Sequence, residues 1–187
     1  MTRTLPLYFW IVGIILSAVY LPRLREILRA YGGFESYLEV GLFLLAGAAL
    51  VYAVKRNPSR WIGTLARLAL LGAAGGLGWT LLANPDARSR FIEAAHLAEY
   101  GILGVLAFRA FGTAPSVACA MAVGLFDETV QWALASRTGE IRDVALNGLA
   151  GALGTAYSGV VLGFYRQGTR RSLRALLVVA GVLLAGV

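Results

Sequence analysis

The sequence predicts an all-α fold, a bundle of six to seven transmembrane helices, and three observations lead to this prediction. Hydrophobic residues make up 58% of the 187 residues, and the mean hydropathy is +0.71. Only 14% of the residues are charged, against about a quarter in a typical soluble domain. The apolar residues also form repeated runs close to the length of about 20 residues that crosses a bilayer as a helix.

Three spans are expected in residues 1–90, together with one helix on the membrane surface. Pro22 and Arg23 follow the first apolar run and are expected to end the first span. Residues 23–30 then place leucine and isoleucine at helical spacing between charged residues, which predicts an amphipathic helix at the interface. The three expected spans cover about residues 5–21, 37–54 and 61–82.

Residues 91–164 are expected to form a core of three more spans, and residues 165–187 a basic loop followed by a short final span. That final span would begin near Ser172. Glycines recur in the third and sixth spans, where they permit close contact between helices in lipid. The expected core spans cover about residues 91–108, 115–134 and 141–164. The glycines concerned are Gly72, Gly75, Gly76, Gly78, Gly148, Gly151 and Gly154.

The positions of lysine and arginine predict the orientation of the chain. With seven spans, nine of the basic residues that flank the spans fall on the N-terminal side and seven on the opposite side. Basic residues favour the cytoplasmic side, so we expect a cytoplasmic N-terminus. The polar ends of spans 4, 5 and 6 then lie at the outer face. Because the net charge of +7 is explained by residues that flank spans, no nucleic-acid partner is expected.

Residues 93–147 concentrate polar groups inside the three core spans. They include the only histidine of the chain, His96, and six of the ten carboxylates. Ionisable side chains in lipid are costly unless they face one another, a cavity or a headgroup. This stretch is therefore the expected functional site.

Helical spacing places these groups on three polar stripes, one on each core span. Span 4 begins on the side of the membrane where span 5 ends and span 6 begins. The three stripes are therefore expected to converge on one cavity near the outer face. The stripes are Glu93, His96 and Tyr100 in span 4; Asp127, Glu128 and Gln131 in span 5; and Glu140, Asp143 and Asn147 in span 6.

Arginines near the same face predict a basic rim around this cavity. Guanidinium groups bind phosphate well, so a rim of this kind suits a phosphate-bearing headgroup. The arginines are Arg88, Arg90, Arg137 and Arg142.

Several of these residues have more than one interpretation. Asp127 and Glu128 form either a general acid/base pair or counter-ions for nearby arginines. Tyr100 and Asn147 either orient a ligand or only form interhelical hydrogen bonds worth about 1 kcal/mol. Glu93 and His96 form an ExxH pair, but a metal site in a bundle needs a second such pair. We therefore predict no metal site, and the sequence names no cofactor.

The combination of these elements resembles the VanZ-like family over about residues 91–154. The sequence reads EAAHLAEYGILG from Glu93, GLFDETVQ from Gly124 and RTGEIRDVALNGLAG from Arg137. The family takes its name from a bacterial membrane protein linked to resistance to teicoplanin, a lipoglycopeptide antibiotic. The resemblance implies a multi-pass protein of the bacterial plasma (inner) membrane. By position it carries over His96, Tyr100, Asp127, Glu128, Gln131, Arg137, Asp143 and Asn147, while Glu93 and Glu140 match less closely.

Two functions are expected candidates, and the sequence leaves open whether the protein is an enzyme. In the first, the pocket binds a cell-envelope amphiphile, either a lipid-linked precursor or a lipoglycopeptide such as teicoplanin, with membrane lipids as further partners. In the second, a hydrolase or transferase acts on a phosphate-bearing lipid, with His96 as general base beside Asp127 or Glu128. Proton-coupled transport is disfavoured, because the polar groups cluster at one face. The expected ligand-binding residues are Glu93, Tyr100, Gln131, Arg137, Arg142, Asp143 and Asn147.

Overall fold

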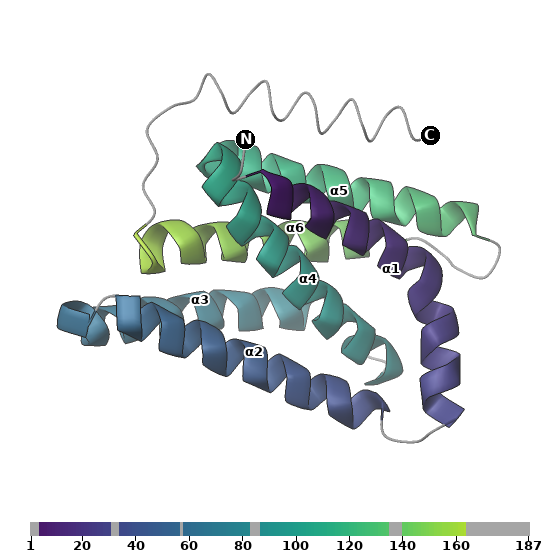
Figure 1. Ribbon diagram of the computed structural model, residues 1–187, viewed down its shortest axis with the longest axis horizontal. Coiled ribbons are helices and arrows are strands. Elements are labelled where there is room, and N and C mark those ends of the chain that lie inside the picture. The colour runs from purple at the N-terminus through teal and green to yellow at the C-terminus, as the bar shows by residue number, and fades with distance from the viewer. Residues whose placement is uncertain (1–3, 31–33, 57, 83–86, 135–139, 164–187) are drawn as a thin grey trace.

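The computed structural model describes residues 4–30, 34–56, 58–82, 87–134 and 140–163, and all the regular structure in these residues is helical. The helices pack side by side as a bundle (Figure 1). The expected all-α fold is therefore confirmed for this part of the chain. In order, the elements are α1 (Leu5–Ala30), α2 (Phe34–Arg56), the 3₁₀ turn η1 (Pro58–Arg60), α3 (Trp61–Leu82), α4 (Ala87–Phe111), α5 (Thr113–Ala133), α6 (Ile141–Ala156) and the π-helical turn η2 (Tyr157–Val161).

Helices α4, α5 and α6 form the centre of the bundle and contact one another more than any other set of elements. Helix α4 crosses α6 at an angle, while α2 and α3 lie together on one side of this centre (Figure 1). Only Gly112 separates α4 from α5. Its φ of 91° lies in a region that side chains other than glycine rarely adopt, so this residue permits the abrupt reversal of the chain.

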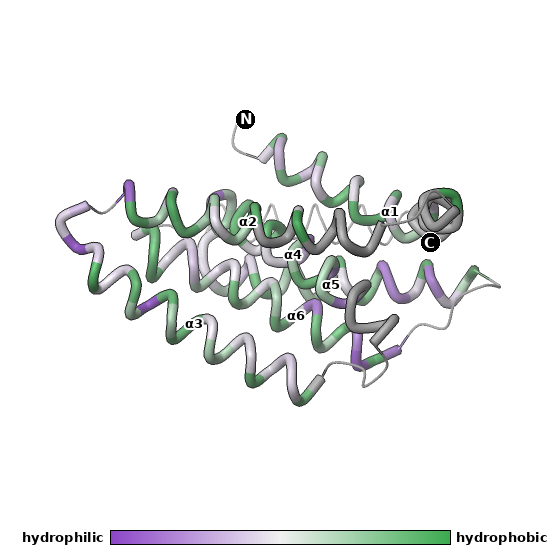
Figure 2. The backbone as a smooth tube through the Cα atoms, turned by 90° about the horizontal axis from the view of Figure 1, so that it is seen from below, coloured by the Kyte–Doolittle hydropathy of each residue, from purple (hydrophilic) through white to green (hydrophobic). Residues whose placement is uncertain are grey.

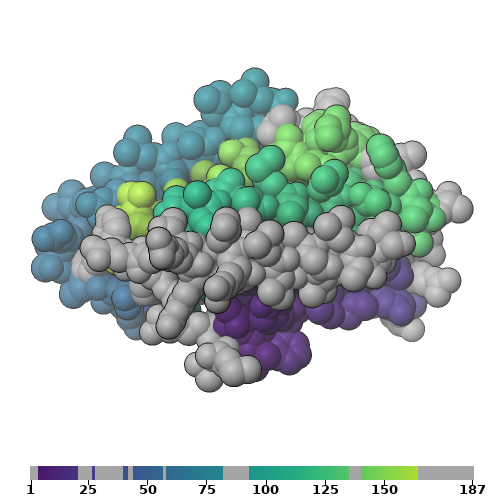
Figure 3. Space-filling model, turned by 90° about the horizontal axis from the view of Figure 1, so that it is seen from above, coloured from purple at the N-terminus to yellow at the C-terminus, as the bar shows by residue number. Residues whose placement is uncertain are grey.

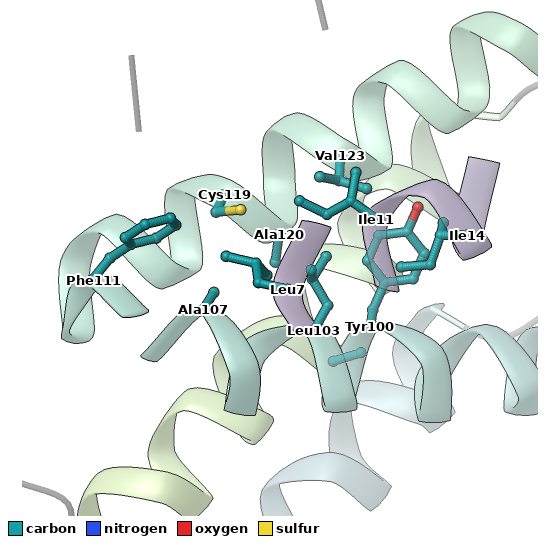
Figure 4. Packing of buried hydrophobic residues seen from close by; sticks show 11 residues of the cluster. Leu7, Ile11, Ile14, Tyr100, Leu103, Ala107, Phe111, Cys119, Ala120 and Val123 are labelled. Carbon is teal, nitrogen blue, oxygen red and sulfur yellow. The ribbon is translucent and has the colours of Figure 1, made fainter. Parts of the chain in front are cut away.

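Helix α1 is attached to this centre by an apolar face. Leu7, Ile11 and Ile14 recur at helical spacing and are buried against residues of α4 and α5. Figure 4 shows the ring of Tyr100 beside Ile14, within the same cluster as Val123. Side chains of α1 and α5 reach one common surface of the molecule (Figure 3). The N-terminal helix is thus part of the core that surrounds the polar residues.

Glycines allow the backbones of α4 and α6 to meet. A Cβ atom added to Gly104 would collide with the backbone of Gly151, and one added to Gly154 would collide with the backbone of Gly101. Small residues at such crossings are what close helix packing in lipid requires. The expected role of glycine in the sixth span is confirmed for Gly151 and Gly154.

The same expectation holds for only half of the glycines in the third span. Gly75 and Gly78 approach the side chains of Leu153 and Leu149 on α6. Among the described residues, no atom lies within 4 Å of a Cβ added to Gly72 or Gly76, so no close helix contact is described for these two. Helix α3 therefore contacts α6 along one face, and glycine spacing alone does not identify that face.

Helix α1 does not end where the sequence predicted. Pro22 was expected to stop the first span, but the helix continues from Leu5 to Ala30. Figure 1 shows α1 turning sharply in its later part. A proline inside a helix removes one backbone hydrogen bond and often bends the helix rather than ending it. The expected surface helix of residues 23–30 is therefore a continuation of α1.

The outer surface of the bundle is rich in large apolar side chains. Such exposure is unusual for a soluble monomer, whereas it is required where helices face lipid. Two described stretches are long and apolar enough to cross a membrane, Pro58–Leu81 with 24 residues and Ile141–Val161 with 21 residues. Helix α4 is not one of these two stretches because its ionisable residues lower its hydropathy. The expected total of six to seven spans stays a prediction. Exposed examples are Phe9, Leu44, Leu70, Leu77, Leu81 and Trp132.

Candidate functional site

A hydrogen bond between buried side chains joins α4 to α5. The hydroxyl of Tyr100 donates to Oδ2 of Asp127 at 3.1 Å. The tyrosine is 0% exposed and the aspartate 1% exposed. Inside a bundle the phenol hydroxyl needs an acceptor and the carboxylate needs donors, so each group reduces the cost of burying the other.

His96 lies next to this pair, one helical turn before Tyr100 on α4. The centroids of the two rings are 6.4 Å apart, and the ring planes are inclined by 40°. His96 is half-buried, in contrast to the fully buried tyrosine. The structure therefore places an imidazole, a phenol and a carboxylate as successive neighbours, with the imidazole nearest the exterior of the bundle.

Glu128 connects the end of α5 to the start of α6. Its Oε2 atom accepts a hydrogen bond of 3.0 Å from the backbone N–H of Glu140, the residue that precedes α6. Its Oε1 atom lies 3.4 Å from the side-chain amide nitrogen of Gln131. A carboxylate at a helix N-terminus stabilises the unpaired N–H groups there. Glu128 therefore helps to position the first turn of α6.

Arg142 is the centre of a cluster of three carboxylates. Its Nη2 atom lies 2.9 Å from Oε1 of Glu93, 3.2 Å from Oε2 of Glu140 and 3.3 Å from Oδ1 of Asp143. Glu93 belongs to α4, so this arginine ties the first turn of α6 to α4. With three carboxylates around one guanidinium, these four residues carry an excess of negative charge.

Asn147 places an amide group at the junction of α4, α5 and α6. It is 1% exposed, and within the described residues neither its nitrogen nor its oxygen has a hydrogen-bond partner. A Cβ added to Gly124 would lie 3.1 Å from Cβ of Asn147 and 3.6 Å from Cε1 of Tyr100. Glycine at position 124 therefore leaves the room in which Asn147 sits beside Tyr100. A buried amide in this state is suited to a bound water or ligand group.

A shallow groove runs along the surface between α5 and α6, next to these contacts. Its volume is about 60 Å³. Two carboxylate-bearing residues line it among apolar side chains, and the exposed Trp132 and Ile141 border it. Almost all of the lining surface is apolar, so the groove itself suits an apolar segment of a ligand. The lining residues are Leu125, Glu128, Thr129, Trp132, Glu140, Ile141 and Val144.

These contacts bring residues of the three polar stripes together. One contact joins α4 to α5, one joins α5 to α6 and one joins α6 to α4. The groove is not lined by His96, Tyr100 or Asn147, however. Tyr100 bonds to Asp127 and does not line the groove. The functional role of these polar groups stays a prediction. The three contacts are Tyr100 to Asp127, Glu128 to the backbone of Glu140, and Arg142 to Glu93.

The described part of the predicted basic rim differs from the prediction. Arg137 and the side chains of Arg88 and Arg90 lie outside the described residues. Arg142 is surrounded by carboxylates, which compete with any phosphate for its donors. Sequence position indicates which arginines lie near this end of the bundle. It does not show that carboxylates surround Arg142 in the folded protein. Across the described ranges, no group of three or more His, Cys, Asp or Glu residues could hold a metal ion.

Glu99 is a polar residue of this region that was not among the predicted site residues. Its backbone oxygen accepts a bond of 2.9 Å from Nε1 of Trp10 on α1. Within the described part of the chain its Oε2 atom is buried and has no hydrogen-bond partner. The sequence did not predict the contact of Glu99 with α1, because nothing in it placed α1 against α4.

The comparisons with known proteins concern this same part of the chain. Residues 77–162 match the family model described as VanZ/LLP1. No curated protein and no solved structure matches the chain. The matched residues begin in α3 and extend through η2, so they include every contact between α4, α5 and α6 described above.

Proposed function

Because residues 77–162 form a VanZ-like domain of a membrane protein, we propose that this domain binds an amphiphile of the bacterial cell envelope near the outer face of the membrane. The ligand is a lipid-linked envelope precursor or a lipoglycopeptide such as teicoplanin. One observation carries the proposal: a groove with an apolar wall reaches the surface beside a cluster of polar and charged groups.

The groove suggests how the two parts of the ligand are held. Its wall, which includes Leu125 and Val144, is almost entirely apolar and suits a hydrocarbon chain. The polar part of the ligand would lie beside the groove, near the exposed side chain of Glu140. A volume of about 60 Å³ is small against the range of about 300–1,000 Å³ that is common for drug-sized ligands. The groove therefore holds one segment of the amphiphile, and the remaining tail stays in the bilayer.

The charges beside the groove restrict the chemistry of the polar part. Arg142 is engaged by three carboxylates, and Glu128 and Glu140 both line the groove. Carboxylates accept hydrogen bonds from hydroxyl, amide and ammonium groups. Support is therefore stronger for a ligand that presents such donors at this position than for a bare phosphate.

A groove-filling variant tests this proposal. Val144→Trp blocks the groove, whereas Val160→Trp puts the same side chain on an exposed position at the opposite end of the same helical segment. With teicoplanin as the probe and purified protein in detergent micelles, we expect Val144→Trp to raise the Kd at least about tenfold. Val160→Trp should leave it unchanged. Wild-type affinity in Val144→Trp would reject the groove as the binding site.

The same proposal extends to antibiotic resistance, because the matched domain is VanZ-like. Expression of the protein in a susceptible bacterium should raise the inhibitory concentration of teicoplanin, and Val144→Trp should abolish that increase. A lipid-linked precursor is favoured as the ligand if teicoplanin does not bind but a precursor fraction from the envelope does.

A second candidate function is enzymatic, and the succession His96, Tyr100 and Asp127 favours it. In this alternative a membrane-embedded hydrolase or transferase acts on a phosphate-bearing lipid. His96 is the general base, and Asp127 or Glu128 acts as its acidic partner. Mass spectrometry of lipid incubated with purified protein would detect a product, which His96→Gln and Glu128→Gln should each abolish. Wild-type function in both variants rejects the enzyme, and binding without any product favours the first candidate.

A further inference from the structure

The charged residues are divided between the two ends of the bundle. The polar site lies at one end of the bundle, where α5 ends and α6 begins (Figure 1). The other end contains the end of α2, the start of α3, the end of α4 and the turn η2 (Figure 1). Figure 2 shows hydrophilic residues at the turn between α2 and α3 and again along the end of α5. We call the end near the turn between α2 and α3 the basic end, and its cations are Lys55, Arg56, Arg60, Arg67 and Arg109.

The described residues around Lys55, Arg60 and Arg67 contain no carboxylate. Residues 45–56, 58–70, 105–111, 113–124 and 154–163, which form this end of the bundle, contain no Asp or Glu. The ion pairs of Arg142 lie at the opposite end. The described residues of the basic end therefore supply cations, Lys55, Arg60 and Arg67 among them, and no acid.

The cations of the basic end are exposed, and two of them are held in place by neutral groups. All five side chains are exposed. Nε of Arg56 donates to the backbone oxygen of Leu162 at 3.2 Å, and Nη1 of Arg67 donates to that of Val160 at 3.1 Å. These carbonyls belong to the end of η2, where a helix carries partial negative charge. The bonds orient the guanidinium groups, and a neutral carbonyl acceptor does not cancel the charge of a guanidinium group.

Amphipathic and apolar side chains surround these cations. Tyr52 precedes Lys55 by one helical turn, and Trp61 and Ile62 follow Arg60 directly. All three of these flanking residues are exposed. Tyrosine and tryptophan are enriched at the level of lipid headgroups, and arginine binds phosphate oxygens with paired hydrogen bonds. Cations flanked by tyrosine and tryptophan are therefore expected at the level of the lipid headgroups.

We propose that the basic end binds the anionic phospholipid headgroups of the leaflet opposite to the polar site. Residues from α2, η1, α3 and α4 contribute cations, so one headgroup layer would hold together the ends of helices that are distant in sequence. This surface is separate from the amphiphile groove, and the two proposals can fail independently.

Charge-neutralising and charge-retaining variants test the proposal. The variant K55Q/R60Q removes two cations, and K55R/R60K retains both charges at the same positions. Each protein is purified in nonionic detergent, and its thermal unfolding midpoint is measured with added phosphatidylglycerol or phosphatidylcholine. Phosphatidylglycerol should raise the midpoint of the wild type and of K55R/R60K, and high salt should weaken this effect. For K55Q/R60Q the apparent affinity should fall about fivefold for each cation removed.

Two results would overturn the proposal. One is equal stabilisation of K55Q/R60Q and the wild type by phosphatidylglycerol, and the other is equal stabilisation of the wild type by both lipids. Native mass spectrometry of the same mixtures counts bound phosphatidylglycerol directly, so the answer does not depend on the unfolding midpoint alone. Far-UV circular dichroism should show the same helix content in all three proteins, because both substituted residues are exposed.

Discussion

Tyr100 shows how a single residue can determine the contact between two helices. Tyr100→Phe removes the bond to Asp127 and keeps the ring that packs in the core. We expect the free energy of unfolding to fall by about 1 kcal/mol, as is typical of an interhelical hydrogen bond in a membrane protein. Unfolding in mixed micelles of nonionic detergent and dodecyl sulfate measures the change. Tyr52→Phe on the exposed surface of α2 is the control, and an equal loss in both variants would contradict this role.

Arg142 holds α4 and α6 together by charge. Arg142→Gln removes a cation from among three carboxylates, one of which, Glu93, is largely buried. Breaking a buried pair by removing one partner costs more than the pair itself contributes, so we expect a loss of about 2 kcal/mol or more. The same unfolding experiment measures it.

A variant that combines Arg142→Gln with Glu93→Gln separates the contribution of the Arg142–Glu93 ion pair from other effects of Arg142. Adding Glu93→Gln removes the carboxylate on α4, so the double variant should be more stable than Arg142→Gln alone. Strictly additive losses would show that the two side chains do not interact in the membrane-embedded protein.

At the scale of elements, the crossing of α4 and α6 depends on glycine. Gly104→Ala places a methyl group against the backbone of Gly151, so the helices must separate. Overpacking of this kind costs about 1–3 kcal/mol. Gly76→Ala is the matched control, since its new methyl group meets no atom of the described residues within 4 Å and alanine favours the helix. If Gly104→Ala were as stable as Gly76→Ala, the described crossing would be incorrect.

The elements also explain which parts of the site could be predicted. Helical spacing alone placed Tyr100, Asp127 and Asn147 on inward faces, because an inward polar face is the only inexpensive position for such groups in lipid. Spacing could not show that Glu128 accepts a bond from the start of α6 or that Glu99 meets α1. Those contacts depend on how the helices are rotated and stacked, which a pattern within one helix does not contain.

At the scale of the whole molecule, the division of charge predicts the orientation in the membrane. In a background that lacks Cys119, single cysteines at Ser36 and Ser59 mark the two ends of α2. With a cytoplasmic N-terminus, a membrane-impermeant maleimide should label S36C but not S59C in intact cells. As a control, both S36C and S59C should be labelled after the membrane is disrupted, which shows that both thiols can react. The reverse pattern in intact cells would invert the orientation and place the polar site in the cytoplasmic leaflet.

The sequence by itself determined that this protein is a helical bundle with a VanZ-like domain and that its costly polar groups gather at one end of three consecutive helices. Both conclusions follow from local properties, namely apolar length, helical spacing and the cost of charge in lipid. Only the tertiary structure decided which groups pair. It surrounded Arg142 with acids and left Asn147 without a described partner beside Tyr100. It also continued α1 past Pro22. Partner choice depends on the distance between side chains of different helices, which the packing of the bundle sets.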